Sequence, residues 1–170
     1  MKTISFRNDV LPLKDVLYRL AQRITLDSDE AEDVVQETMI KIWNRREQWN
    51  EIESMEAFSL TICRNVALDH VRKKTRRDEF FISNDRDSAD LSRSPFEQAM
   101  QKDRIEQVRK IIDSLNEKQR TCIQLRDFEG KQYKEIATIM GISEEQVKVN
   151  IHRARQAIKQ KFQQIEDYGL

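Results

Sequence analysis

Glycine, proline and cysteine are scarce in this sequence of 170 residues, which has three glycines, two prolines and two cysteines. With 35% charged and 38% hydrophobic residues, the composition predicts a soluble, mostly helical protein. No apolar run approaches the roughly 20 residues needed to span a membrane, and residues 1–10 carry no signal-peptide core. We therefore expect a cytoplasmic protein without membrane insertion.

The two cysteines are Cys63 and Cys122, and each lies inside an apolar helical pattern. We interpret both as buried thiols in a reducing compartment. The metal-binding spacings CxxC and HExxH are absent, so we expect no metal and no cofactor. No nucleophile pattern accompanies the carboxylates, which argues against an enzyme.

Charge is distributed in blocks, although the formal net charge is zero. Residues 27–38 carry only acidic charges, whereas the charges of residues 64–77 are nearly all basic, with Asp69 as the exception. Separated blocks create strong local fields despite a neutral sum. The zero net charge therefore does not exclude binding to nucleic acid.

Apolar residues recur at helical spacing in the N-terminal part, within residues 11–77, and again after residue 95. Between them, residues 78–94 are rich in Ser, Asp and Asn and lack a sustained period, which is typical of a linker. The sequence Ser94-Pro95-Phe96-Glu97 then gives a helix start. We predict an all-α fold of two small helical domains, residues 1–77 and 95–170, joined by a flexible linker.

A helix-turn-helix is predicted in the sequence "YKEIATIMGISEEQVKVNIHRARQAI", residues 133–158. Gly141 can adopt the left-handed conformation that ends the first helix, and Ser143 with Gln146 forms a capping signature for the second. The C-terminal domain is therefore expected to be a four-helix domain whose second helix-turn-helix helix enters a major groove.

The outward face of this helix carries groups that can read DNA: Lys148, Val149, His152 and Arg153. An arginine can read guanine edges and a valine can touch a thymine methyl group. Lys131 and Arg155 flank the helix and could hold phosphates. The alternative is a plain helical hairpin with a solvated basic face, because helix C-termini favour cations in any case.

Two further surfaces are predicted in the N-terminal domain. The first is a stripe opposite the core face of the acidic helix, where an apolar residue among polar ones indicates protein docking: Asp33, Gln36, Glu37 and Ile40. The alternative is an ordinary solvated face.

The second surface combines a basic helix with a loop that bears aromatic and amide groups, which suits single-stranded DNA. Its residues are Trp49, Asn50, Asn65, Asp69, Arg72 and Lys73. Core packing is the alternative for the tryptophans; we favour it for Trp43 and leave Trp49 open.

Residues 31–43 ("AEDVVQETMIKIW") and 57–74 ("AFSLTICRNVALDHVRKK") resemble the second conserved region of bacterial sigma factors. Residues 115–158 resemble their fourth region. The spacing between them, with no intervening domain, resembles the small extracytoplasmic-function (ECF) class.

The resemblance implies that Asp33, Gln36 and Glu37 dock on the β′ clamp helices of core RNA polymerase. It implies that the loop 49–53 and helix positions such as Asn65 capture an unstacked base of the promoter −10 element. Lys148, Val149, His152 and Arg153 would read the −35 element. The C-terminal domain would touch the β flap, and an anti-sigma factor is an expected partner.

Two departures from the family affect promoter choice. Val149 and Asn150 stand at positions where Ser and Arg are frequent in recognition helices of the family. The resemblance therefore does not give the base sequence of the −35 element. Few aromatic residues are available for melting, chiefly Trp49 and Phe58, so we expect weaker melting and stricter promoter choice.

Two other functions fit parts of the sequence. A free-standing helix-turn-helix regulator would bind intact duplex DNA, often as a dimer. A protein-binding helical adaptor would leave Lys148 and Arg153 without a role.

Overall fold

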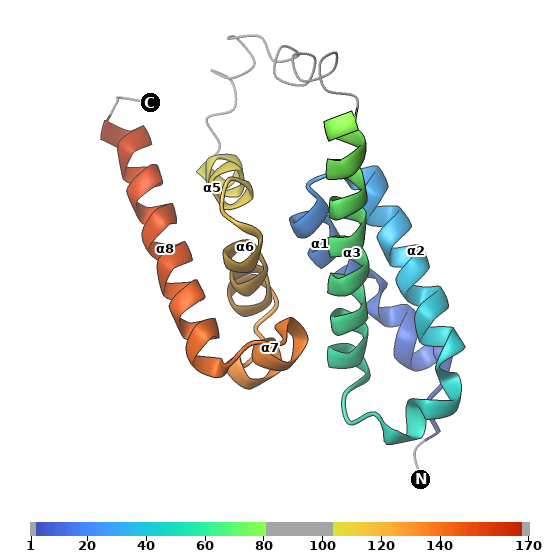
Figure 1. The fold of residues 1–170 in the computed structure, drawn as a ribbon. Helices are drawn as coiled ribbons and strands as arrows, with labels where there is room; N and C mark the ends of the chain where they lie inside the picture. Colours follow the sequence, from blue (N-terminus) through green and yellow to red (C-terminus); the bar gives the residue numbers. More distant parts are fainter. Residues whose placement is uncertain (1–2, 81–103, 168–170) are drawn as a thin grey trace.

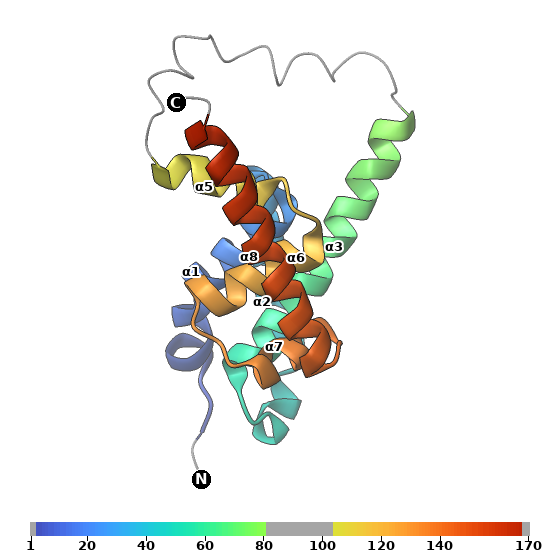
Figure 2. The ribbon, with the colours of Figure 1, turned by 90° about the vertical axis from the view of Figure 1, so that its left-hand side faces the viewer.

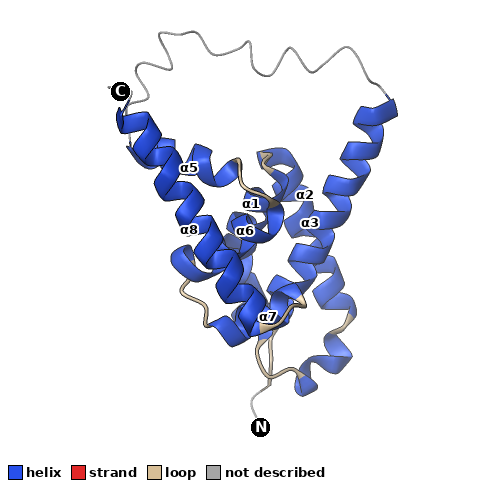
Figure 3. Ribbon diagram, turned by 60° about the vertical axis from the view of Figure 1, so that its left-hand side comes forward, coloured by secondary structure: helices blue, strands red, loops and turns tan. Residues whose placement is uncertain are grey.

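The structure is a computed structural model that describes residues 3–80 and 104–167. All regular secondary structure in these ranges is helical, which confirms the predicted all-α fold (Figure 3). Neither range contains a helix that is both long enough and apolar enough to cross a membrane.

The N-terminal group contains three long helices and three short helical turns. The α-helices are α1 (Lys14–Thr25), α2 (Ser28–Asn44) and α3 (Met55–Phe80), and the short turns are Phe6–Val10, Leu11–Leu13 and Arg46–Glu51. Helix α3 continues past the predicted end at Arg77, because Asp78 and Glu79 do not break a helix as Gly or Pro would. The rest of the predicted linker and the helix start at residues 94–97 lie outside the described residues.

Within residues 104–167, the C-terminal group contains four helices, as predicted. They are α5 (Arg104–Asp113), α6 (Glu117–Ile123, extended by a π-helical turn at Gln124–Phe128), α7 (Tyr133–Met140) and α8 (Glu144–Asp167). Helix α8 crosses α6 (Figure 2) and also packs against α5 and α7. The inward face of α8 is buried at Val147, Ile151 and Ala154.

Local capping contacts explain where several helices begin. The Asp27 carboxylate accepts hydrogen bonds from the backbone N–H groups of Asp29 and Glu30 at 2.9 and 3.1 Å, so it caps α2. The Asn116 side chain caps α6 in the same way by accepting from Gln119 N–H at 2.9 Å.

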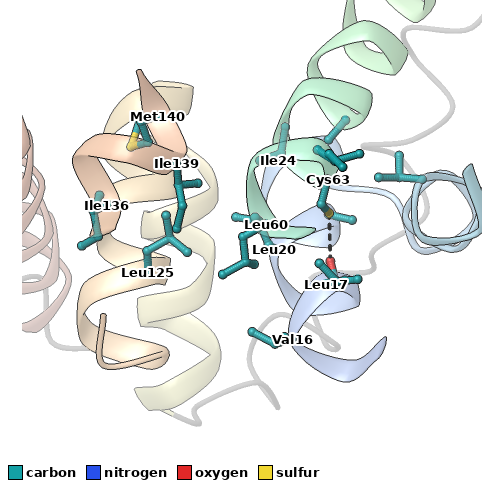
Figure 4. Packing of buried hydrophobic residues seen from close by; sticks show 14 of the residues in the cluster. Val16, Leu17, Leu20, Ile24, Leu60, Cys63, Leu125, Ile136, Ile139 and Met140 are labelled. Carbon is teal, nitrogen blue, oxygen red and sulfur yellow. Dashed lines mark hydrogen bonds between the residues drawn. The ribbon is translucent and has the colours of Figure 1, made fainter. Parts of the chain in front are cut away.

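The N-terminal core lies among α1, α2 and α3, where Leu17, Leu20, Ile24 and Leu60 are fully buried. The Cys63 thiol donates to the Leu17 carbonyl at 3.4 Å (Figure 4). Burial raises the pKa of the Cys63 and Cys122 thiols to about 12, so both remain protonated.

The two helical groups lie side by side and pack against each other (Figure 1). Helix α1 contacts α6, and α3 contacts α7. From the C-terminal group, Leu125 and Ile139 point toward Leu20 and Leu60 of the N-terminal group (Figure 4). Ile139 of α7 is buried, and α7 packs against α3 of the N-terminal group.

The turn of the helix-turn-helix has the predicted geometry. Gly141 ends α7 with φ of 66°. Ser143 and Gln146 then cap α8 reciprocally: each side chain accepts a 3.1 Å hydrogen bond from the backbone N–H of the other residue. This is a complete capping box.

We expect Gly141→Ala to lower the free energy of unfolding by about 1 kcal/mol, because a residue with a Cβ is strained at positive φ. No heavy atom beyond the chain neighbours lies within 4 Å of the position that the Cβ would occupy, so backbone strain is the whole cost. Gly141→Asn should lose less, since asparagine tolerates this conformation better. Urea denaturation measures both, and an alanine variant as stable as the parent would contradict the prediction.

Candidate docking and nucleic-acid surfaces

The docking stripe of α2 consists of Asp33, Gln36, Glu37 and Ile40, and it lies opposite the buried residues Ala31, Val34 and Val35. Asp33 and Gln36 are exposed, and Ile40 exposes 60% of its surface. Glu37 is half-buried. Single exposed aliphatic side chains are common on protein surfaces, so docking at this stripe stays a prediction.

Trp43 extends the docking stripe, contrary to our expectation that it packs in the core. It is 46% exposed, whereas Trp49 is 6% exposed and fills the core beside it. The Trp49 indole N–H donates to the Ile42 carbonyl at 3.1 Å, which holds that ring inward. Trp43 packs edge-on against Phe6 and Trp49, with centroid distances of 5.7 and 6.1 Å. Its spacing of three residues from Ile40 is the sequence signal that could have placed it on the stripe.

The loop before α3 therefore offers an amide rather than an aromatic face. Asn50 is exposed, while the buried ring of Trp49 is not accessible to a base in this conformation. Trp49 instead fixes the loop through its hydrogen bond to α2.

The outer face of α3 carries the other predicted single-strand contacts. Asn65, Asp69, Arg72 and Lys73 are all exposed, and their spacing places them on one side of the helix. Asp69 and Arg72 form an ion pair at 3.5 Å. Asn65 therefore lies on the same side of α3 as the basic residues near the C-terminal end of this helix.

The acidic block of α2 and the basic block of α3 face each other. Lys74 pairs with Asp27 at 3.5 Å, and Arg77 approaches Glu30 at 3.9 Å. These pairs are exposed, so each contributes at most about 1 kcal/mol. Together they join the start of α2 to the C-terminal end of α3.

His70 joins the two blocks by contacting a carboxylate with each ring nitrogen. Its Nδ1 lies 2.8 Å from Glu30 Oε2, and its Nε2 lies 2.8 Å from Glu37 Oε2. Only the doubly protonated ring can donate both hydrogen bonds. Burial alone would lower the pKa of His70, but the hydrogen bonds to Glu30 and Glu37 outweigh it and raise the pKa. Glu30 and Glu37 lie 40 and 33 positions from His70 in the sequence, so no local pattern signals this bridge.

The reading face of α8 consists of Lys148, Val149, His152 and Arg153, and all four side chains are exposed. Val149 exposes 44% of its surface. The neighbouring Asn150 turns its amide back to the Gln146 carbonyl at 2.8 Å.

The two flanking cations already have partners. The Arg155 guanidinium makes two hydrogen bonds to Asp127, at 2.6 and 3.2 Å. Lys131 forms an ion pair with Glu56 of α3. A phosphate contact by either cation would require it to exchange this partner.

Family models match both helical groups. Residues 10–77 match the model described as sigma-70 region 2, and residues 105–158 match the model described as sigma-70, region 4. The RNA polymerase sigma-H factor of Pseudomonas aeruginosa is 34% identical in an alignment 164 residues long that covers 91% of this chain and 84% of that protein. The chain belongs to the sigma-70 family.

Other relatives place this sigma factor in the ECF group. It is 31% identical to the ECF RNA polymerase sigma factor SigL of Mycobacterium tuberculosis, over 88% of this chain and 84% of the relative. It is 27% identical to the ECF sigma factor SigX of Bacillus subtilis, over 89% and 80% of the two chains.

Solved structures support the fold. The sigma factor RpoE of Bartonella quintana, in complex with the anti-sigma factor NepR, superposes with a TM-score of 0.72 at 24% identity, over 93% of this chain and 96% of that one. CnrH, in complex with the cytosolic domain of CnrY, superposes with a TM-score of 0.65 at 20% identity, over 97% and 89%.

The His70 contacts predict a pH-dependent stability. Because its pKa is raised on folding, the stabilisation is complete below about pH 6.5, the unfolded value, and is lost as the pH rises through the folded value. As the pH rises from about 6.5 through the pKa of His70 in the folded state, we expect the free energy of unfolding of the parent to decline relative to that of His70→Gln. Denaturation at several pH values measures it, with His152→Gln, at an exposed position of α8, as the matched control. Parallel pH profiles of the parent and His70→Gln would refute the role.

Proposed function

We propose that this sigma factor binds core RNA polymerase and directs promoter-specific initiation, reading the −35 element as duplex and the −10 element as a melted strand. The proposal rests on one observation: each candidate surface lies within the sigma-70 region whose function would require it. The region 2 match contains an exposed docking stripe, and the region 4 match contains an exposed reading face on the second helix of a helix-turn-helix.

The docking stripe, extended by Trp43, would contact the β′ clamp helices. Asp33 and Glu37 supply carboxylates for cations on the partner, while Ile40 and Trp43 supply apolar area. Aromatic anchors flanked by charged groups typically dominate the binding energy of such interfaces. His70 holds one oxygen of Glu37 and leaves the other free to bind.

The −10 element would be read between the loop and α3. The exposed amides of Asn50 and Asn65 can hydrogen-bond to the edges of an unstacked base, and Arg72 and Lys73 can hold the strand's phosphates. Asp69 would orient Arg72 through their ion pair. Trp49 would act indirectly by shaping the loop.

The −35 element would be read by α8 in the major groove. Arg153 can bind guanine edges, Val149 can contact a thymine methyl group, and Lys148 and His152 can contribute polar contacts. Arg155 and Lys131 are the candidates for flanking phosphates, after exchange of their present partners.

The proposal assigns region 2 to residues 1–77, a linker to residues 78–94 and region 4 to residues 95–170. Region 4 would also contact the β flap. An anti-sigma factor is a further proposed partner, since the similar RpoE was solved in complex with one. Such a protein would act in the cytoplasm and without a cofactor.

Charge reversal on the docking stripe tests polymerase binding. We expect Asp33→Arg to abolish binding to bacterial core RNA polymerase, measured by co-purification, and promoter-specific transcription in a run-off assay. Glu32→Arg is the matched control, because Glu32 is also exposed but is not part of the stripe. Equal loss in both variants, or in neither, would count against docking at this stripe.

Truncation on the reading face tests recognition of the −35 element. We expect Arg153→Ala to weaken specific initiation and −35 binding about tenfold or more, the scale of one bidentate base contact. Lys159→Ala, on another side of α8, should have little effect. Tight binding of the free protein to an intact duplex, without any affinity for core polymerase, would instead favour a free-standing regulator.

A further inference from the structure

Glu30 and Glu37 lie on the face of α2 that runs alongside α3 (Figure 1). They are seven residues apart, so about two helical turns and about 10 Å separate them along α2. His70 of α3 bridges this gap, with its Nδ1 2.8 Å from Glu30 Oε2 and its Nε2 2.8 Å from Glu37 Oε2. One imidazole ring therefore joins a carboxylate of the docking stripe to a carboxylate outside it.

The charged groups around His70 come from α2 and α3. Glu30 and Asp33 of α2 line a pocket beside the ring, together with three cations of α3: Lys73, Arg76 and Arg77. Among the described residues, α1, α7 and the turn Phe6–Val10, which also pack against α3, contribute no charged group to this pocket. Asp33 belongs to the docking stripe as Glu37 does, so the stripe adjoins His70 at two positions.

The protonation state of His70 decides how many of these contacts it can make. The imidazolium donates to both carboxylates, whereas the neutral ring has a single N–H and can donate to only one. The Glu30 side chain is 24% exposed and is also approached by Arg77 at 3.9 Å, while the Glu37 side chain is 44% exposed and can be solvated by water. We therefore expect loss of the proton to release Glu37 and to leave Glu30 in place.

We propose that His70 is an internal competitor for the docking carboxylate of Glu37, so that core RNA polymerase binds at the docking stripe with release of the His70 proton. A cation of the polymerase and the imidazolium compete for one carboxylate. Acid pH therefore weakens polymerase binding, and His70 determines the pH range in which this happens. The inference rests on the proposed function, because it requires that the polymerase binds at this stripe.

Electrostatic repulsion gives the direction of this coupling. His70 holds one oxygen of Glu37, and a polymerase cation on the other oxygen comes within about 6 Å of the ring, where a like charge disfavours the imidazolium and lowers its pKa. The coupling between two binding events is reciprocal, so loss of the proton must favour the polymerase as much as the polymerase favours loss of the proton. Polymerase therefore binds more tightly above the pKa of His70 than below it.

The pH range lies near neutrality. Burial lowers the pKa of His70 in the free protein, but the hydrogen bonds to Glu30 and Glu37 outweigh burial and raise it above 6.5. A neighbouring charge at this distance shifts a pKa by about 1–3 units, and one unit corresponds to a tenfold change in an equilibrium constant. We expect the smaller shift, since Glu37 is partly solvated.

Proton release on binding tests the coupling directly. Titration calorimetry of the full chain with bacterial core RNA polymerase, in buffers of different ionisation enthalpy, counts the protons released at each pH between about 6 and 9. We expect the parent to release up to about one proton more than His70→Gln, whose side chain stays neutral throughout. The dissociation constant of the parent should fall about tenfold more than that of the variant as the pH rises. Titration of the polymerase itself cancels in this comparison.

Substitutions of the two carboxylates separate competition from a structural role. Glu37→Gln removes the group for which the cations compete, so we expect weaker binding and the same proton release as in His70→Gln. Glu30→Gln keeps the competition but removes one group that raises the pKa of His70, so its proton release should move to lower pH. Glu32→Gln removes the same charge from an exposed position outside the stripe and should keep the parental profile. If His70→Gln does not fold, the shift in Glu30→Gln decides alone.

The outcomes separate this inference from the proposed function. Equal proton release by the parent and His70→Gln, in complexes that initiate specifically, would overturn the competition and leave docking at the stripe intact. Tighter binding of the parent at acid pH, relative to His70→Gln, would overturn it as well. Absence of binding to core polymerase at every pH, by the parent and all variants, would overturn both.

Discussion

The packing of the two helical groups depends on the buried guanidinium of Arg64. A charge at this depth is tolerated only when it is paired and hydrogen-bonded. Glu117 supplies the counter-charge and the Met140 carbonyl supplies a further acceptor, so one side chain ties α3 to the start of α6 and the end of α7. Removal of one partner from such a pair typically costs about 3–5 kcal/mol, a large part of the stability of a domain.

Helix α3 consequently serves two purposes on opposite faces. Its inward face carries Arg64 and Leu60, which hold the C-terminal group. Its outward face carries Asn65 and Arg72, which are candidates for contact with the −10 strand. Since neighbouring residues on one helix belong to both faces, the candidate −10 contacts lie within a few residues of the contact with the C-terminal group.

Helix α2 shows how one acidic block can be divided between folding and binding. Glu30 and Glu37 are held by His70, and Glu30 is also approached by Arg77, so these carboxylates help to join α2 to α3. Asp33 stays exposed within the docking stripe. A neutral chain can therefore present a strongly acidic surface at one place and a basic one at another.

Sequence by itself determined the features that arise from contacts within a few residues. The capping box of Ser143 and the left-handed turn at Gly141 follow from local chemistry, and the structure confirms them. The caps at Asp27 and Asn116 are contacts of the same local kind. Apolar periodicity likewise determined the all-α fold.

Only the tertiary structure decided features whose partners lie far along the chain. Trp43 and Trp49 are both plausible core residues, and their actual exposure depends on which ring fits beside Ile42. The bridging role of His70 and the burial of Arg64 depend on residues more than 30 positions away. Periodicity assigns a residue to a helix face, but burial and pairing on that face are set by the element that packs against it.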